Sequence, residues 1–262
     1  MQRYVDLSIC IENDLISDPP FAIPEITYLN HSQTMERMQH FFPDLAPENL
    51  PEEAAWAIER IKLTTHNGTH MDAPYHFHPT MNHDLIEGGE PAATIDEIPL
   101  EWCFRPGVKL DFRHLADGYV VTAADVAREL ERIDHQLSPF DIVLINTRAG
   151  SRYGKDDYLK VGCGMGREAT LYLLERGVRI TGIDAWSWDV PFQYTSERVD
   201  QSGDYSLIWE GHKAGRERAY CHMEKLHNLE ALPAKGFQVV CFPIKIKRAS
   251  AGWTRAVAIL NE

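Results

Sequence analysis

The sequence predicts an α/β fold in which helices pack on a β-sheet. From about residue 105 onward, short apolar runs with the alternating period of strands take turns with longer runs of helical period, a rhythm typical of α/β layer proteins. With 262 residues, 44% of them hydrophobic, the chain is also long enough to bury one sizeable core. No internal repeat or low-complexity segment is present, so we expect one domain over residues 1–262.

The elements are predicted in chain order from their periodicity and end signals. Alternation of Val5, Leu7 and Ile9 predicts a first strand. Thr122 and Asp125 have the spacing of a capping box, which predicts the start of a helix. The later strands are expected at VKLDF (108–112), DIVLIN (141–146), VRITGID (178–184), FQVVCF (237–242) and TRAVAIL (254–260), and the helices at AADVARELERI (123–133) and REATLYLLERG (167–177).

Residues 17–60 have a different composition and predict an arm or lid. Proline at the density found there prevents long helices and central strands, and the aromatic side chains between the prolines exceed what a simple linker carries. The prolines are Pro19, Pro20, Pro24, Pro43, Pro47 and Pro51, and the aromatic residues include Phe21, Tyr28, Phe41 and Phe42. We expect an irregular segment that packs across subunits near the active site.

Charge and composition exclude several classes of protein. The formal net charge is -13, from 39 acidic and 26 basic residues, which repels phosphate backbones and makes nucleic acid an unfavourable partner. No apolar run reaches the roughly 20 residues of a membrane span, and the polar start "MQRYVDLSIC" is not a signal peptide. We therefore expect a cytoplasmic protein without a membrane partner.

Five scattered cysteines without a C-x-x-C pair predict reduced thiols.

The segment "THNGTHMDAPYHFHP", residues 65–79, gathers four histidines and one aspartate. Asn67-Gly68 is a turn signal and Pro74 disfavours a continuing helix, so the His66 and His70 pair cannot lie on one continuous helix. In an extended chain their α-carbons would be roughly 13 Å apart, at the limit of reach for a shared ion. The chain should therefore bend between them, at Gly68.

Two imidazoles and a carboxylate form a mixed nitrogen and oxygen ligand set that suits zinc, manganese or iron. Three protein ligands leave positions open for water, which is typical of a catalytic site. The alternative is a turn-rich loop with surface histidines. That interpretation suits a single histidine better than four in this spacing.

The segment "HNGTHMDAPYHF" resembles the H-x-G-T-H-x-D-x-P-x-H-F signature of the cyclase family of metal-dependent hydrolases, which includes bacterial kynurenine formamidases and isatin hydrolases. Four further segments resemble the family more weakly and occur in the same order along the chain as in the family. They are "DLS", "ERGVRITGIDAWSWD", "EGHKAGRERAYCHMEKLHNLEALP" and "SAGWTRAVAIL". The resemblance implies a mixed β-sheet core with flanking helices, of the swivelling β/β/α type, and a homodimer or homotetramer.

The resemblance also implies a set of site residues. His66, His70 and Asp72 match the metal ligands, and His76 matches the histidine assigned to proton transfer. In two-metal members the aspartate bridges, and a later histidine and glutamate twelve residues apart complete a second site; the matching residues here are His212 and Glu224. Lys213 stands where the family often has a second histidine. One or two zinc or manganese ions per subunit are expected.

The implied function is hydrolysis of an amide, lactam, lactone or formamide bond in a small cyclic or aromatic substrate. A metal-activated water would attack the carbonyl carbon, and His76 would transfer the proton. The alternatives are a metal-dependent lyase or cyclase on the same site and a non-catalytic metal or ligand binder. A binder has no need for the proton-transfer histidine.

Further residues carry two interpretations each. Trp186, Trp188, Phe192 and Phe41 are candidates for a planar substrate pocket, although such residues commonly form core. Asp184 either supports a ligand imidazole or caps the end of a strand. His78 and His83 are expected at the pocket edge or in solvent. The segment "GCGMGRE" and the Cys221-His222 pair suggest a phosphate loop and a cysteine nucleophile, but turn geometry and a buried thiol explain them better.

Overall fold

The computed structural model describes residues 1–261, and the chain divides into two compact units. The first unit contains residues 1–10 and 65–262, and the second contains residues 11–64. The first unit holds the large sheet and all of the candidate metal ligands.

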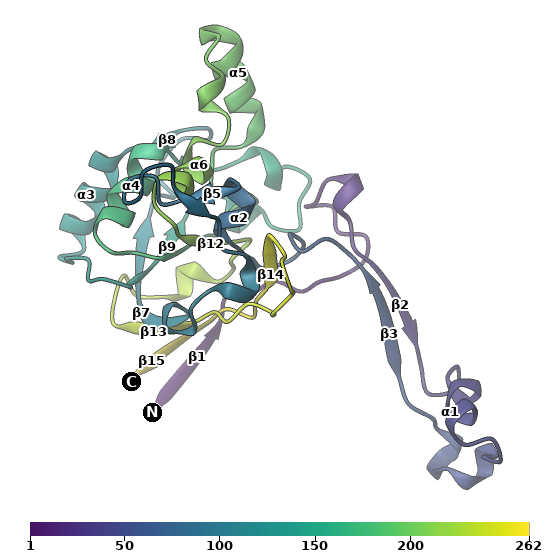
Figure 1. The fold of residues 1–262 in the computed structure, drawn as a ribbon. Coiled ribbons are helices and arrows are strands. Elements are labelled where there is room, and N and C mark those ends of the chain that lie inside the picture. Colours follow the sequence, from purple (N-terminus) through teal and green to yellow (C-terminus); the bar gives the residue numbers. More distant parts are fainter. Residues whose placement is uncertain (262) are drawn as a thin grey trace. The chain divides into compact units, whose positions relative to one another are not determined.

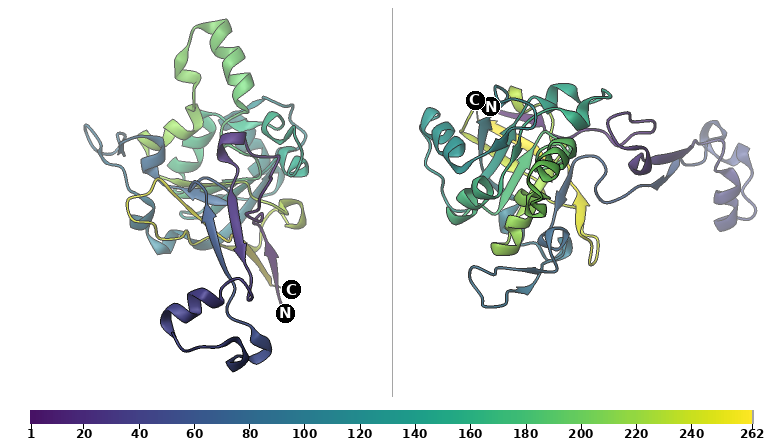
Figure 2. Two further views of the ribbon diagram at one scale, coloured as in Figure 1. Left: turned by 90° about the vertical axis from the view of Figure 1, so that its right-hand side faces the viewer. Right: turned by 90° about the horizontal axis from the view of Figure 1, so that it is seen from above.

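A nine-stranded mixed sheet lies at the centre of the first unit (Figure 1). Four neighbouring strands, β7, β9, β11 and β12, run parallel, and the remaining pairs are antiparallel. The two chain ends lie side by side because β1 pairs with β15 (Figure 2). In sheet order the strands are β1 (Gln2–Asp6), β15 (Val257–Asn261), β13 (Phe237–Val240), β7 (Phe104–Asp111), β9 (Ile142–Asn146), β11 (Ile180–Ile183), β12 (Cys221–Glu224), β4 (His70–Asp72) and β14 (Ala251–Trp253).

Hydrophobic side chains cover both faces of this sheet. In β9, Ile142 and Leu144 belong to one core cluster, whereas Val143 and Ile145 belong to a second cluster that includes buried residues of α3 and α4. A strand buried on both faces is typical of an α/β protein, so the predicted fold class is confirmed. The helices of this unit are α2 (Pro74–Phe77), α3 (Ala123–Arg132), α4 (Arg167–Glu175), α5 (Phe192–Ser202), which projects from the body, and α6 (Glu210–Glu217) (Figure 1).

Small elements connect the main ones. β8 (Val120–Val121) pairs with β10 (Gly164–Met165), and β5 (Thr80–Met81) pairs with β6 (Glu90–Pro91). Short 3-10 helices of this unit lie at Ile95–Glu97, Leu100–Trp102, Ala149–Arg152, Tyr158–Lys160, Tyr205–Leu207 and Leu229–Ala231.

Most elements predicted after residue 105 are confirmed, with one difference at the N-terminus. Helix α3 begins at the predicted capping box, where the Thr122 hydroxyl accepts from the backbone N–H of Asp125. The first strand ends at Asp6, although the alternation continues beyond it. After Asp6, the backbone N–H of Leu7 donates to the Ala256 carbonyl, and the carbonyl of Leu7 accepts from the N–H of His227. Leu7 therefore bonds to two different segments and does not continue the ladder with β15.

The second unit contains regular strands that the proline count did not predict. β2 (Glu25–Leu29) and β3 (Ile58–Lys62) form an antiparallel ribbon, and α1 (Met35–Phe41) lies between them in sequence. The prolines precede these strands instead of interrupting them, and several fall in the 3-10 turns Pro20–Ala22, Pro47–Asn49 and Pro51–Glu53. Large apolar side chains are exposed here, including Tyr28, Phe41, Phe42 and Ile61. Packing of this segment across subunits stays a prediction.

Two further expectations concern the chain as a whole. Within residues 1–261, no helix combines the length and the apolar character needed to cross a bilayer. The five cysteines are free thiols in the described structure, as predicted.

Candidate metal centre

Two neighbouring strands supply the floor of the site. In the antiparallel pair β4 and β12, His70 lies opposite Glu224 and Asp72 lies opposite His222. Because alternate residues of a strand point to the same face, all four side chains lie together on one face of the sheet. Met71, between the two β4 residues, is buried in the core cluster of the opposite face.

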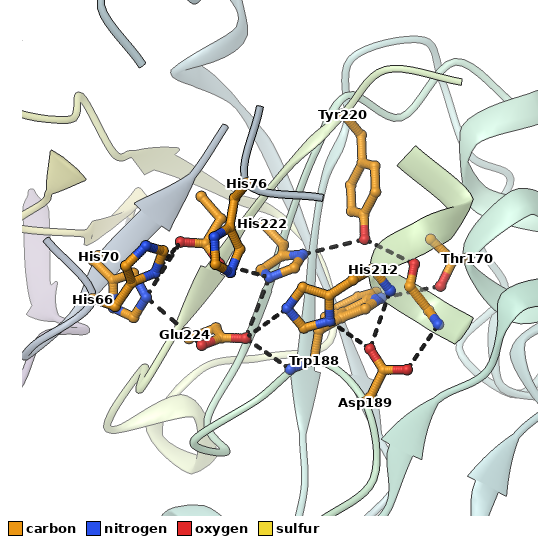
Figure 3. A network of polar contacts seen from close by, with 12 residues as sticks. His66, His70, His76, Thr170, Trp188, Asp189, His212, Tyr220, His222 and Glu224 are labelled. Atoms are coloured by element: carbon orange, nitrogen blue, oxygen red, sulfur yellow. Dashed lines mark hydrogen bonds and ion pairs between the residues drawn. The ribbon is translucent and has the colours of Figure 1, made fainter. Parts of the chain in front are cut away.

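Three more histidines approach this floor from outside the two strands (Figure 3). His66 comes from the turn before β4, where Gly68 has a φ of +61°, so the predicted bend at Gly68 is confirmed. His76 lies on α2, a single turn that begins with Pro74, and not on an extended continuation of β4. Proline is favourable at the first helical position because its missing N–H needs no partner there. His212 belongs to α6.

One group of ligand atoms surrounds the first carboxylate oxygen of Asp72. Oδ1 of Asp72 lies 3.0 Å from Nδ1 of His66 and 3.3 Å from Nε2 of His70. The same His70 nitrogen is 3.6 Å from Oε2 of Glu224. The structure therefore brings together the three ligands predicted from the histidine-rich segment.

A second group surrounds the other oxygens of the same two carboxylates. Nε2 of His222 lies 3.2 Å from Oδ2 of Asp72 and 3.3 Å from Oε1 of Glu224. Nε2 of His212 is 3.5 Å from that Oε1 atom. Ligand atoms of Asp72, His212, His222 and Glu224 all lie within 4.8 Å of one another. Asp72 and Glu224 thus direct one oxygen to each group, the arrangement that a bridging carboxylate requires.

The buried polar atoms at the centre fit a cation. Nε2 of His70, both carboxylate oxygens of Asp72 and Nε2 of His222 are buried and form no hydrogen bond. A buried polar atom without a partner costs about 1–3 kcal/mol, and here several such atoms converge. Imidazole nitrogens and carboxylate oxygens in this number suit a divalent metal ion.

The far nitrogen of each ligand imidazole is held by a hydrogen bond to another group. Metal-binding histidines are typically oriented in this way, because the outer bond fixes the ring and the tautomer. The four outer partners are the Gly68 carbonyl for His70, the Ser250 hydroxyl for His66, the Asp189 carboxylate for His212 and the Tyr220 hydroxyl for His222.

The buried carboxylates and imidazoles of this cluster shift one another's pKa values. Burial alone would raise the pKa of Asp72, but the imidazoles of His70, His222 and His66 hold it well below its usual range. Burial would lower the pKa of His212, whereas the carboxylates of Asp189 and Glu224 raise it to about 10. These shifts favour an ionised Asp72 and a protonated His212 at neutral pH, and a bound cation would replace that proton.

The described side chains of the site are most exposed at His66 and His76. The side chains of His66 and His76 are 30% and 20% exposed, whereas that of His212 is 2% exposed. His76 places Nε2 3.7 Å from Oδ2 of Asp72, and its ring packs against Trp209 with centroids 5.1 Å apart. Burial lowers the pKa of His76 to about 4, so its imidazole is neutral at neutral pH.

The candidate substrate aromatics lie at different depths. Trp188 is fully buried and stacks on His222 with centroids 5.5 Å apart, so it supports the ligands from behind. Trp186 and Phe192 meet edge to face at 5.5 Å and line one cleft. Phe41 lies in the second unit, where it contacts Trp56. Contact of these side chains with a substrate stays a prediction.

Sequence reasoning missed three members of this site, namely His222, Asp189 and Tyr220. His222 precedes Glu224 by two residues, and this spacing on a strand was the available signal. Asp189 ends the segment "DAWSWD", which begins with Asp184. Asp184 itself accepts hydrogen bonds from the N–H and hydroxyl of Thr147, at the end of β9, which fits the strand-end cap.

The remaining histidine of the segment, His78, and the nearby His83 lie outside the ligand groups. His78 and His83 both contact the hydroxyl of Thr80, at 3.0 Å and 2.8 Å. Neither belongs to a group of potential ligands in the described structure. Cys221 is buried on the opposite face of β12, among core residues.

Comparison with known proteins decides the family. Residues 5–190 match the family model described as "Putative cyclase". The chain belongs to the cyclase family. A curated relative of this chain is the kynurenine formamidase of Erythrobacter litoralis (strain HTCC2594), which is 25% identical over 201 residues, 76% of each chain.

Solved structures share the fold of this chain. An isatin hydrolase bound to the product analogue thioisatinate superposes with a TM-score of 0.73 at 19% identity, covering 100% of this chain and 93% of that chain. Isatin hydrolase A from Labrenzia aggregata, bound to benzyl benzoate, gives a TM-score of 0.73 at 24% identity and covers 100% and 94%. The expected cyclase-like architecture is therefore confirmed.

Proposed function

We propose that this protein is a metal-dependent hydrolase that opens an amide, formamide, lactam or ester bond of a small cyclic or aromatic substrate. The convergence of unpartnered ligand atoms on one face of β4 and β12 carries the proposal. Family membership supports it, as do relatives named for hydrolysis of a formamide and of isatin.

The first group, His66, His70 and Asp72, would hold a catalytic ion, because it lies beside the exposed rim of the site. A divalent ion bound there supplies Lewis-acid activation of water and of a carbonyl group. His212 and Glu224, with Asp72 as the bridge, would hold a second ion. Zinc or manganese suits both groups of ligands.

His76 is the group best placed to move the proton. Its imidazole is neutral at neutral pH, partly exposed and close to the ligand carboxylate of Asp72, so it can accept a proton at Nε2 and release it to the leaving group. Because the imidazole also lies near His66 and Asp72, it could instead be a metal ligand. Substitution of His76 distinguishes the two roles.

The deciding experiment combines metal analysis with turnover. Purified protein loaded with zinc or manganese should hydrolyse at least one member of a panel of aryl formamides, cyclic amides and lactones. His76→Asn should retain its metal content and lose turnover. Loss of metal in this variant would make His76 a ligand, and full activity would reject its role. Products formed in labelled water separate hydrolysis, which incorporates the label, from elimination or ring closure.

We further propose a cytoplasmic homodimer or homotetramer. The ribbon of β2 and β3 supports this assembly, since an isolated two-stranded ribbon is marginally stable and the second unit exposes Tyr28, Phe41 and Ile61. A second copy of the chain would cover this apolar surface. Light scattering of the purified protein measures the mass directly, and a monomer at micromolar concentration would reject the assembly.

A further inference from the structure

His222 has an unusual environment for a fully buried histidine. Its Nε2 atom lies 3.2 Å from Asp72 Oδ2 and 3.3 Å from Glu224 Oε1, yet this nitrogen forms no hydrogen bond. The ring is 0% exposed, so water cannot satisfy it from outside. A buried imidazole nitrogen directed at two carboxylates needs either a proton or a metal ion between them.

The hydrogen bonds behind the ring leave its Nε2 atom available for a metal ion. The Tyr220 hydroxyl donates to the Gly211 carbonyl at 3.1 Å, so toward His222 Nδ1, 3.2 Å away, it acts as the acceptor. Nδ1 then carries the hydrogen, which leaves Nε2, the nitrogen on the side of Glu224 (Figure 3), as the ring atom that can bind a metal ion. This is the tautomer in which an Nε2-ligating histidine binds metal.

Packing holds the ring in the orientation that ligation requires. Two aromatic rings stack on the imidazole and are nearly parallel to it. Trp188 stacks at 5.5 Å with an interplanar angle of 13°, and Phe77 stacks at 5.0 Å with an angle of 21°. Rotation of the imidazole away from the carboxylates would therefore clash with one of these neighbours.

The spacing of the donor atoms fits a four-coordinate ion. In a tetrahedral site with metal–ligand distances of about 2.0–2.1 Å, the ligand atoms lie about 3.3 Å apart. The separations of His222 Nε2 from the Asp72 and Glu224 oxygens are 3.2 Å and 3.3 Å, and His212 Nε2 lies 3.5 Å from the same Glu224 oxygen. Two nitrogens and two oxygens from protein side chains complete such a site.

We propose that His222 is a metal ligand and that it closes the second site with Asp72, His212 and Glu224. Four protein ligands leave no position for water in a tetrahedral site, which is typical of a structural ion. The ion would link β4, β12 and α6, and the water-activating role would fall to the open group around His66 and His70. The inference rests on the proposal that this centre binds metal.

Metal titration of the chelator-treated protein tests the assignment. Wild-type protein should take up two zinc ions per chain, and its cobalt form should have the strong visible absorption of a tetrahedral site. In His222→Ala the uptake of one ion should weaken by at least 100-fold, and the cobalt absorption should decrease. His114→Ala, which removes an exposed histidine, is the matched control and should leave both measurements unchanged.

Tyr220→Phe gives an independent measurement if the alanine variant folds poorly. It keeps His222 but removes the hydroxyl that fixes its tautomer, so uptake of the same ion should weaken by about 10–100-fold. Unchanged isotherms and cobalt spectra in either folded variant would overturn the assignment. Turnover of the loaded wild type tests the hydrolase proposal separately, because an inactive protein can still lose one ion on substitution of His222.

Discussion

Asp72 and His222 are direct partners across the antiparallel strands β4 and β12, and their Oδ2 and Nε2 atoms lie 3.2 Å apart. The other oxygen of Asp72 faces His66 and His70. One carboxylate therefore belongs to both groups of ligands. This relationship couples the open half of the centre to its buried half.

Replacing Asp72 by Asn should remove both ions, because the amide loses the negative charge that each group shares. His70→Ala should instead remove only the ion at the open group. Elemental analysis after dialysis measures the two stoichiometries, with Asp200→Asn, an exposed aspartate on α5, as the control. Retention of one tightly bound ion in Asp72→Asn would contradict the bridging arrangement.

Asp189→Asn should weaken metal binding by about 10–100-fold without removing any ligand. The Asp189 carboxylate accepts hydrogen bonds from the backbone N–H groups of Gly211 and His212 and from Nδ1 of His212. Asp184→Asn is the matched control, because Asp184 is a buried aspartate of the same segment whose carboxylate bonds to Thr147. Competition with a chromophoric chelator measures both affinities. Equal effects of the two substitutions would show that Asp189 acts only through folding.

Asp184 should also make stability depend on pH. Burial outweighs the hydrogen bonds from Thr147 and raises the pKa of Asp184 from 3.8 to about 8. Between these values the native state holds a proton that the unfolded chain has lost. The contribution of this proton to the free energy of unfolding is therefore fully present below pH 4 and decreases as the pH rises toward 8. The slope is at most about 1.4 kcal/mol per pH unit.

Asp184→Asn lacks this titration, so its stability relative to wild type should improve from pH 5 to pH 8. Urea unfolding at pH 5, 6, 7 and 8 measures the difference. At pH 5 the variant should be the less stable protein, since one acceptor for the Thr147 N–H is lost. A difference that stays constant over this range would mean that Asp184 is ionised in the native state.

Metal binding should release protons between pH 6 and 9. The carboxylates around His212 raise its pKa to about 10, so a proton competes with the cation throughout this range and affinity should rise with pH. Calorimetry in buffers of different ionisation enthalpy counts the protons released. His212→Ala should release fewer protons per bound ion, and an equal number in both proteins would place the proton on another group.

The local pattern of the chain predicted half of the centre, because His66, His70 and Asp72 are neighbours in sequence and Gly68 permits the bend that joins them. His222 could not be found in this way. Its role depends on the register that places it opposite Asp72 and on the tautomer set by Tyr220. Register between distant strands is a tertiary property, and the alternation of His222 and Glu224 gives only the shared face.

In the second unit, too, strand pairing could not be predicted from the local sequence. The prolines of residues 17–60 predicted an irregular arm, whereas β2 follows Pro24, β3 follows Pro51, and the two strands pair with each other. The positions of the prolines show where a strand cannot continue. They do not show whether the short segments that follow the prolines pair with each other.

Gly68→Ala should test the bend at the open group. Gly68 has a φ of +61°, a left-handed conformation that costs a residue with a β-carbon about 1–2 kcal/mol. The variant should therefore unfold at lower urea concentration and bind the ion of His66 and His70 more weakly. The ion at His212 should be unaffected, because that histidine lies on α6.

Gly68→Asn is the matched variant, since asparagine tolerates left-handed backbone better than alanine. Its loss of stability should be smaller, and equal losses would mean that side-chain volume, and not backbone conformation, sets the requirement for glycine.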